Sequence, residues 1–185
     1  PTLTNVTFSG NTAEVFGGGM ILWLSSSTLT DVTFIGNTAV INGGGMWISG
    51  SVSALTNSIL WGNSPEEIHF VEDIEPSSIA ITYSDIQGGE AGIVTNDNGI
   101  VYWGNGNIDA DPLFCDPDNG DFTLASNSPC VGTGQDGANM GALGIGCSEP
   151  LDIVDNIIPN TYTLSSYPNP FNPITSIKYS LSENG

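Results

Sequence analysis

The apolar positions in the first half of the chain fall in short runs that recur at a constant interval. The runs are rich in Thr, Val, Ile and Phe and are separated by glycines, which is typical of strands joined by turns. One motif begins at four positions, each 26 residues after the last: Leu3, Leu29, Leu55 and Ile81. A repeat of this length and composition predicts one coil of a parallel β-solenoid, with each coil about 4.8 Å above the previous one.

Stacked coils would bring equivalent positions above one another, so that like side chains form ladders. The four residues that begin the motif form one apolar ladder. Each asparagine of the repeat follows a glycine, which predicts a corner whose backbone only glycine adopts easily. Three independent turns would also account for the asparagines, but they would not need a constant spacing, so stacked amides are the preferred interpretation. The spacing predicts a second apolar ladder, a threonine ladder and an asparagine ladder, formed by Phe8, Phe34, Leu60 and Ile86, by Thr4, Thr30, Thr56 and Thr82, and by Asn11, Asn37 and Asn63.

The repeat fades after residue 90, where the composition also changes. Only Glu14 and Asp31 are acidic before residue 65, although the chain has 20 acidic residues in all. Because a solenoid needs a terminal unit with a polar outer face, residues 91–148 are predicted to form irregular, acidic closing coils that act as a cap. The three cysteines of the chain lack the CxxC spacing of zinc and redox motifs. They could form one disulfide and leave one free thiol, or they could be three buried thiols. All three lie in this segment: Cys115, Cys130 and Cys147.

The repeats resemble those of a known family. Phe8-Ser-Gly-Asn11 and Phe34-Ile-Gly-Asn37 have the form FxxN, and each is followed by a Gly-Gly-Gly-Met turn. Together they resemble the repeats of polymorphic outer-membrane proteins and related pectin-lyase-like surface proteins, over about residues 1–90. The resemblance implies an all-β, right-handed parallel β-helix and an exported setting. It assigns no activity, because that superfamily ranges from polysaccharide cleavage to adhesion.

The end of the chain carries a string rich in proline and asparagine. Its prolines force an extended backbone, and residues 174–181 then alternate as a strand, so a linker ending in an edge strand is one interpretation. The string also closely resembles the start of the type A C-terminal sorting domain of the type IX secretion system of Bacteroidetes-like bacteria, a small Ig-like β-sandwich. The string consists of Tyr167, Pro168, Asn169, Pro170, Phe171, Asn172 and Pro173.

This second resemblance implies that residues 149–165 are a linker and that residues 166–185 begin a truncated sorting domain. It implies export by the type IX machinery to the cell surface, attached to the outer membrane, or to the medium. The chain starts within a repeat, without an initiator methionine, and such sorting domains have several more strands. We therefore expect the sequence to be cut at both ends.

The charge balance excludes several classes of function. Lys178 is the single cation, arginine is absent, and the formal net charge is -19. Binding to nucleic acid or to an anionic membrane needs Lys and Arg, so neither is expected. No run approaches the ~18 apolar residues of a membrane span, so none is predicted. Lyases of the pectin-lyase-like fold are similar to one another in using an Arg or Lys base, which the coils of this chain lack.

The remaining candidates for chemistry are two acidic clusters. Residues 66–75 place five carboxylates around the only histidine, His69, and could hold a general acid and base, although such a run is more often a solvated loop. Asp116, Asp118 and Asp121 offer the hard oxygens that calcium prefers, although they depart from the EF-hand pattern and are also good turn formers. Calcium is therefore the candidate ligand, and no cofactor is required.

These observations favour a monomeric, non-enzymatic module for adhesion, surface structure or glycan binding, with surface polysaccharide as its partner. The alternative is a polysaccharide hydrolase whose catalytic coils lie partly outside this sequence. Glycoside hydrolysis needs two carboxylates about 5 to 9.5 Å apart. A face with paired carboxylates would favour the enzyme, and a face of Thr, Ser and Asn would favour the binding module.

Overall fold

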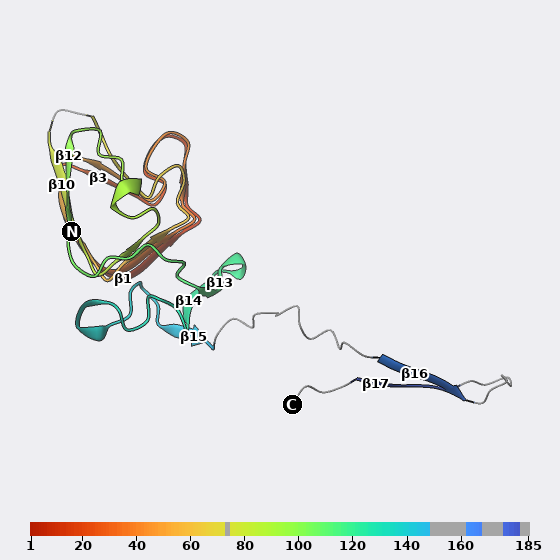
Figure 1. Ribbon diagram of the computed structural model, residues 1–185. Coiled ribbons are helices and arrows are strands. Elements are labelled where there is room, and N and C mark those ends of the chain that lie inside the picture. The colour runs from red at the N-terminus through yellow and green to blue at the C-terminus, as the bar shows by residue number, and fades with distance from the viewer. Residues whose placement is uncertain (73–74, 149–161, 168–175, 182–185) are drawn as a thin grey trace. The chain divides into compact units, whose positions relative to one another are not determined.

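The computed structural model describes residues 1–72, 75–148, 162–167 and 176–181. The chain divides into two compact units, Pro1–Pro150 and Leu151–Gly185, which we describe separately. The first unit is a parallel β-helix, seen in Figure 1 nearly along the direction in which its coils stack. The division at residues 90, 148 and 165 made from the sequence stays a prediction.

The strands of successive coils pair in parallel and form three sheets, of which the largest receives strands from every coil. The first coil contains β1 (Thr2–Ser9), β2 (Thr12–Ala13) and β3 (Met20–Trp23). The second contains β4 (Ser26–Ile35), β5 (Thr38–Ala39) and β6 (Met46–Ser49), and the third contains β7 (Val52–Thr56), β8 (Ile59–Trp61) and β9 (Ile68–Phe70). The fourth contains β10 (Ser77–Thr82), β11 (Asp85–Ile86) and the 3-10 helix η1 (Glu90–Gly92), and β12 (Gly99–Trp103) begins the next coil.

The register of these strands confirms the 26-residue repeat. Thr4 pairs with Thr30, Thr30 with Thr56, and Thr56 with Thr82, all in parallel. The two apolar ladders pair in the same way, so stacked coils, and not hairpins, account for the repeat. Ile81 pairs next with Trp103, where the 26-residue spacing ends but the parallel sheet continues.

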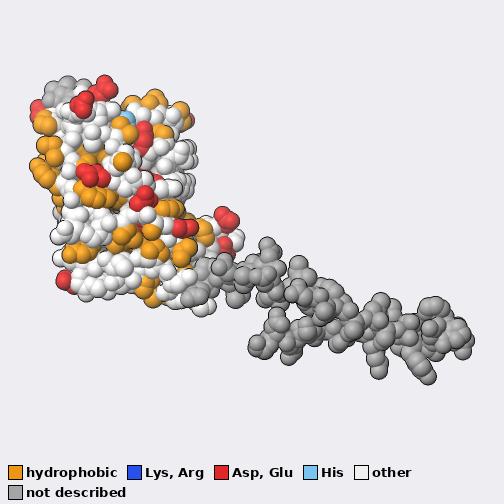
Figure 2. Space-filling view, in the orientation of Figure 1, with side chains coloured by type: hydrophobic (Ala, Val, Ile, Leu, Met, Phe, Trp, Pro, Cys, Tyr) orange, Lys and Arg blue, Asp and Glu red, His pale blue; other side chains and the backbone are white. Residues whose placement is uncertain are grey.

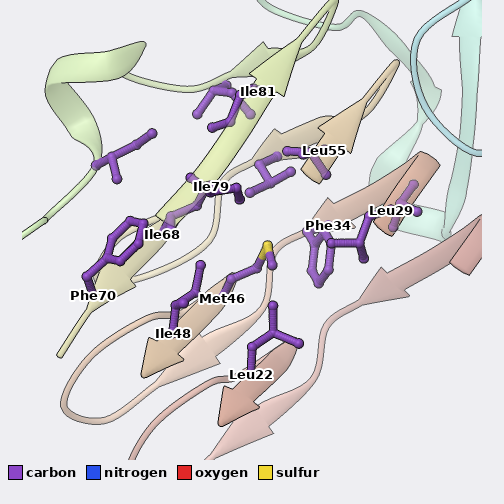
Figure 3. Packing of buried hydrophobic residues seen from close by; sticks show 14 residues of the cluster. Leu22, Leu29, Phe34, Met46, Ile48, Leu55, Ile68, Phe70, Ile79 and Ile81 are labelled. Carbon is purple, nitrogen blue, oxygen red and sulfur yellow. The ribbon is translucent and has the colours of Figure 1, made fainter. Parts of the chain in front are cut away.

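Side chains that point inward from the strands fill the interior of the β-helix (Figure 3). Phe34 and Leu29 of the second coil are fully buried, because coils lie on both sides of them. Phe8 stacks on Phe34 with ring centroids 4.6 Å apart and an interplanar angle of 9°. Leu3 and Phe8 of the first coil are only partly buried, since each is stacked against a neighbour on one side.

Stacked asparagines form a hydrogen-bonded ladder at one corner, as the repeat predicts. The backbone N and Nδ2 of Asn11 donate to Oδ1 of Asn37 at 3.0 and 2.8 Å. The same two groups of Asn37 donate to Oδ1 of Asn63 at 2.9 and 2.8 Å. The preceding Gly10 and Gly36 both have φ of 61°, the left-handed region that the corner requires.

Serine hydroxyls form two further ladders with the same spacing, which the sequence analysis did not identify. At one corner the backbone N of Ser51 donates to Oγ of Ser77 at 3.2 Å. At another, the backbone N of Ser58 donates to Oγ of Ser84 at 3.1 Å. Buried backbone donors at the corners are thus paired with a side chain of the next coil.

Residues after β12 lie against the side of the β-helix, where they form an additional small layer (Figure 1). Its elements are β13 (Phe114–Asp116), η2 (Pro117–Asn119), β14 (Asp121–Ala125), η3 (Gln135–Gly137) and β15 (Ile145–Cys147). Ile59 points outward from β8 and packs against Leu124, Cys130 and Met140 of this layer. The backbone N of Gly141 donates to the Asn57 carbonyl at 2.7 Å.

Of the segment predicted to cap the stack, the residues up to Ile108 continue it as one more coil, with Val94 bridged to His69 and Ile108 to Asp85, whereas the residues after them lie along its side. The layer contacts the side of the coils. In the first two coils the equivalent outward residue is a threonine, whereas in the third coil it is Ile59, whose apolar side chain packs against the layer. Cys115 and Cys147 form a disulfide that joins β13 to β15, and Cys130 is a buried free thiol. One disulfide with one thiol, of the two alternatives, is the arrangement found.

The second unit contains β16 (Tyr162–Tyr167) and β17 (Ser176–Leu181), which pair antiparallel. β17 agrees with the strand expected there. The string from Pro168 to Pro173 lies outside the described residues, so the sorting domain and its Ig-like fold stay predictions. Among the described residues, no helix has the length and apolar character needed to cross a membrane.

Candidate binding groove

A groove on the side of the β-helix lies over the sheet formed by β3, β6 and β9. Alternate residues of these strands point inward, so the residues between them point outward. Ile21 of β3 pairs with Trp47 of β6, and Trp47 pairs with His69 of β9, which gives one outward column across three coils. The groove has a volume of about 460 Å³, and Trp47 and His69 are part of its lining.

Two aromatic side chains form an apolar wall of the groove. Phe16 comes from the turn before β3 and stacks against Trp47, with ring centroids 5.3 Å apart and an interplanar angle of 22°. A parallel bridge between Phe16 and Asn42 of the next coil fixes this turn, and the backbone N of Gly17 donates to the Asn42 carbonyl at 3.2 Å. Phe16 is therefore held beside the outward column by backbone hydrogen bonds.

The triple glycine after Phe16 is explained by the close approach of successive coils. A Cβ atom on Gly18 would lie 2.6 Å from the carbonyl oxygen of Gly44, and one on Gly19 would lie 2.7 Å from that of Gly45. Side chains at these positions would collide with backbone that cannot move away. The glycines thus let the turn of one coil rest directly on the turn of the next.

Polar side chains form the floor of the groove, with His69 at its centre and only 6% exposed. Nδ2 of Asn96 donates to the Phe70 carbonyl at 2.7 Å and lies 3.0 Å from Nε2 of His69. Since the Phe70 carbonyl fixes this amide nitrogen as a donor, Nε2 of neutral His69 accepts and Nδ1 carries the proton. Nδ1 lies 3.4 Å from Oε1 of Glu66.

Glu66 and Glu72 of the predicted acidic cluster have different surroundings. Oε2 of Glu66 accepts a hydrogen bond from the backbone N of Gly43 at 2.8 Å, and Oε1 of Glu66 faces His69. Glu72 lines the groove, is exposed, and makes no hydrogen bond or ion pair within the described part of the chain. Its carboxylate is therefore available to a ligand. Asp73 lies outside the described residues.

Glu67, in contrast, ends the asparagine ladder. It is 5% exposed, its Oε1 accepts from the backbone N of Asn63 at 3.0 Å, and its Oε2 accepts from Nδ2 of Asn63. Burial raises its pKa to about 7, against the opposing effect of these hydrogen bonds. Glu66 and Glu67 border a second hollow of about 230 Å³ beside Asn63. Both oxygens of Glu67 are thus bonded within the ladder, and an acid and base pair in the cluster of residues 66–75 stays a hypothesis.

The aspartates of the calcium hypothesis lie in the side layer. Both oxygens of Asp116 accept from Nδ2 of Asn119, at 3.0 and 2.8 Å. Asp121 accepts from the backbone N and hydroxyl of Thr123, which lowers its pKa. Within the described ranges, no group of three or more His, Cys, Asp or Glu side chains is arranged to hold a metal ion. Calcium binding at Asp116, Asp118 and Asp121 stays a prediction.

A buried polar pair joins the side layer to the β-helix. Oδ1 of Asp85 accepts from the backbone N of Ala110 at 3.1 Å, and Oδ2 accepts from Sγ of Cys130 at 3.2 Å. Burial raises the pKa of Asp85 to about 6 and raises the pKa of the Cys130 thiol. The pair has its bonds satisfied within the fold, so it is structural.

Sequence reasoning missed most of the groove. It singled out His69 and Glu72 for their charge, but Phe16, Trp47 and Asn96 belong to different coils and share no motif. The signal that could have found Trp47 was its outward position next to His69 once the 26-residue register was known.

The fold and the groove together define a parallel β-helix protein with a lateral groove walled by aromatic residues. Comparisons with protein-family models, with curated proteins and with solved structures found no match. The arguments for function therefore come from the geometry of the groove and from the sequence resemblances.

Proposed function

We propose that this chain is a non-enzymatic, glycan-binding module of a secreted or cell-surface protein, and that the lateral groove is its binding site. The observation that carries the proposal is the stacked pair of Phe16 and Trp47 beside the unused side-chain amide of Asn42 and the unused Oδ1 of Asn96 in one groove. Aromatic rings offer flat apolar surface for the C–H faces of sugar rings, and amides pair with hydroxyl groups in either direction.

The free polar groups of the groove suit hydroxyl ligands. Within the described residues, the side chain of Asn42 makes no hydrogen bond. The side chain of Asn96 makes two, both through Nδ2, so its Oδ1 is unused. A sugar lying on Trp47 could donate to the Asn96 oxygen and bond to the Asn42 amide. A groove with a few polar groups beside aromatic rings is typical of small-ligand sites.

The arrangement of carboxylates supports binding over hydrolysis. Glycoside hydrolysis uses two carboxyl groups, one of them a proton donor. In the described part of the groove lining the free carboxylate is that of Glu72, whereas Glu66 is bonded to Gly43 and next to His69. A binding site needs no second carboxylate.

Export through the type IX secretion system belongs to the same proposal. It is supported by the resemblance of Tyr167–Pro173 to a sorting signal and by the Cys115–Cys147 disulfide, because disulfides persist in oxidising compartments. Surface polysaccharide and the secretion machinery are the partners it implies, and the module is expected to act as a monomer.

The test is a binding measurement by calorimetry against a panel of soluble hexasaccharides, neutral, acidic and basic. Trp47→Ala should weaken binding at least about tenfold, equivalent to about 1.4 kcal/mol. Trp23→Ala is the matched control, because Trp23 is 69% exposed at the end of the same sheet and outside the groove lining. Failure of every hexasaccharide to bind, or equal effects of the two substitutions, would overturn the proposal. Chromatography of the incubated sugars would reveal hydrolysis.

A further inference from the structure

We propose that the groove prefers oligosaccharides of amino sugars whose amines are protonated, over neutral or acidic ones. This inference rests on the proposed glycan-binding function and names the class of glycan. Three features of the groove carry it: an unpaired carboxylate, an aromatic wall, and a lining that within the described residues contains no Lys or Arg.

The first feature is the charge of the groove. The carboxylate of Glu72 faces solvent at the groove and has no partner in the described structure. Figure 2 shows acidic side chains across the visible face of the first unit and no Lys or Arg side chain on it. The chain's single cation, Lys178, belongs to the second unit. A uronate or a sulfated sugar would therefore meet repulsion, whereas an ammonium group would meet attraction.

The second feature is the aromatic wall. The face of a tryptophan ring attracts a cation within about 6 Å of its centre. Trp47 stands next to His69 in the outward column, and Glu72 follows two residues after β9 ends. A sugar stacked on Trp47 can thus place an amine where both the ring and the carboxylate attract it.

The third feature is that His69 supplies no competing charge to the groove in its neutral form. Its Nε2 is used by Asn96 and its Nδ1 faces Glu66. The charged and titratable groups that face His69 in the described structure are Glu66 from its own coil and Glu72 at the groove. Neither is positive, so nothing there neutralises Glu72.

A cationic peptide is the competing ligand class, and the groove suits it less well. The groove lies across the outward side chains of β3, β6 and β9, and the open edge of this sheet is the outer edge of β3. Inside the groove a peptide would meet side chains and not a strand edge with which to pair. The unused amide of Asn42 and the unused Oδ1 of Asn96 instead match the hydroxyl groups of a sugar.

The experiment measures binding of the intact chain to four hexasaccharides by calorimetry. The probes are glucosamine, N-acetylglucosamine, glucose and galacturonate hexamers, with hexalysine as the peptide probe. We expect the glucosamine hexamer to bind at least about tenfold more tightly than the acetylated and glucose hexamers. Glu72→Gln should abolish this preference by lowering the affinity for the glucosamine hexamer to that for the glucose hexamer.

Asp136→Asn is the matched control, because Asp136 is exposed in η3, remote in sequence from the groove, and asparagine tolerates its φ of 58°. It removes the same charge and should leave the preference intact. Equal losses from Asp136→Asn and Glu72→Gln would show general attraction to a polyanion and overturn the inference, as would hexalysine binding as tightly as the glucosamine hexamer. Equal affinity for all neutral and basic sugars, lost in Trp47→Ala, would overturn the amine preference alone. The absence of binding to every sugar would overturn the proposed function itself.

Discussion

Glu67 ends the asparagine ladder with a carboxyl group where the other positions have amides. The carboxyl group is 5% exposed, and both of its oxygens accept hydrogen bonds from Asn63. Burial raises its pKa from 4.5 to about 7. Glu67→Gln keeps the shape of the side chain and removes its titration, so it isolates the contribution of this one ionisation to stability.

The sign follows from proton binding. Between pH 4.5 and about 7 the folded state holds a proton on Glu67 that the unfolded state has released. The free energy of unfolding therefore falls as the pH rises through this range. At 1.36 kcal/mol for each pKa unit, the full difference amounts to about 3 kcal/mol. Asp85, whose pKa is raised to about 6, acts in the same direction.

The measurement is urea unfolding of wild type and Glu67→Gln at a series of pH values on both sides of this range. Below pH 4.5 the variant should be less stable by about 1 kcal/mol, because one amide hydrogen of the glutamine faces the Asn63 donor. Above pH 7 the variant should be more stable than wild type by about 2 kcal/mol, because wild type then carries a buried charge.

Glu14→Gln is the control for net charge. Glu14 is exposed, so its replacement changes the overall charge of -19 by the same amount without touching the ladder. General repulsion should respond to salt equally in both variants. If Glu67→Gln shows the same pH dependence as wild type, the ionisation of Glu67 does not limit stability and the reasoning from burial is wrong.

Three other predictions follow from the stacked coils and the side layer. Phe34→Ala should lower the free energy of unfolding, measured with denaturant, by about 3 to 5 kcal/mol. Phe8→Ala should lower it by less, because Phe8 is only partly buried. Equal losses would contradict the stacking of the coils. The disulfide between Cys115 and Cys147 closes a loop with a sequence separation of 32, so replacing both cysteines by serine should lower the free energy of unfolding by about 3 to 4 kcal/mol. Reductant should then have no further effect on the melting temperature of the variant. If calcium binds the aspartates of the side layer, millimolar calcium should raise the melting temperature more than sodium of equal ionic strength, and Asp118→Asn should reduce that difference; an identical rise with sodium would show screening alone.

The local pattern of the sequence determined the repeating part of the fold. In a β-helix each coil contacts mainly the coils beside it, so a constant spacing in sequence becomes a constant spacing in space. The motif at Leu3 and Leu29 is therefore enough to predict the parallel register, the buried ladders and the stacked amides of Asn11 and Asn37. The strand over residues 176–181 was also predictable, from its alternation alone.

The tertiary structure alone decided what happens where the repeat is broken. Ile59 replaces a threonine of the repeat, and together with Trp61 of the same strand it gives the side layer an apolar surface to cover. The pairing of Cys115 with Cys147 depends on how that layer folds, which no spacing reveals. Glu67 lies four residues after Asn63 and not one coil away, so its place at the end of the ladder could not be found from the 26-residue step. The groove, too, is assembled from residues of four coils with no common motif, because a binding surface depends on which side chains meet in space and not on their order along the chain.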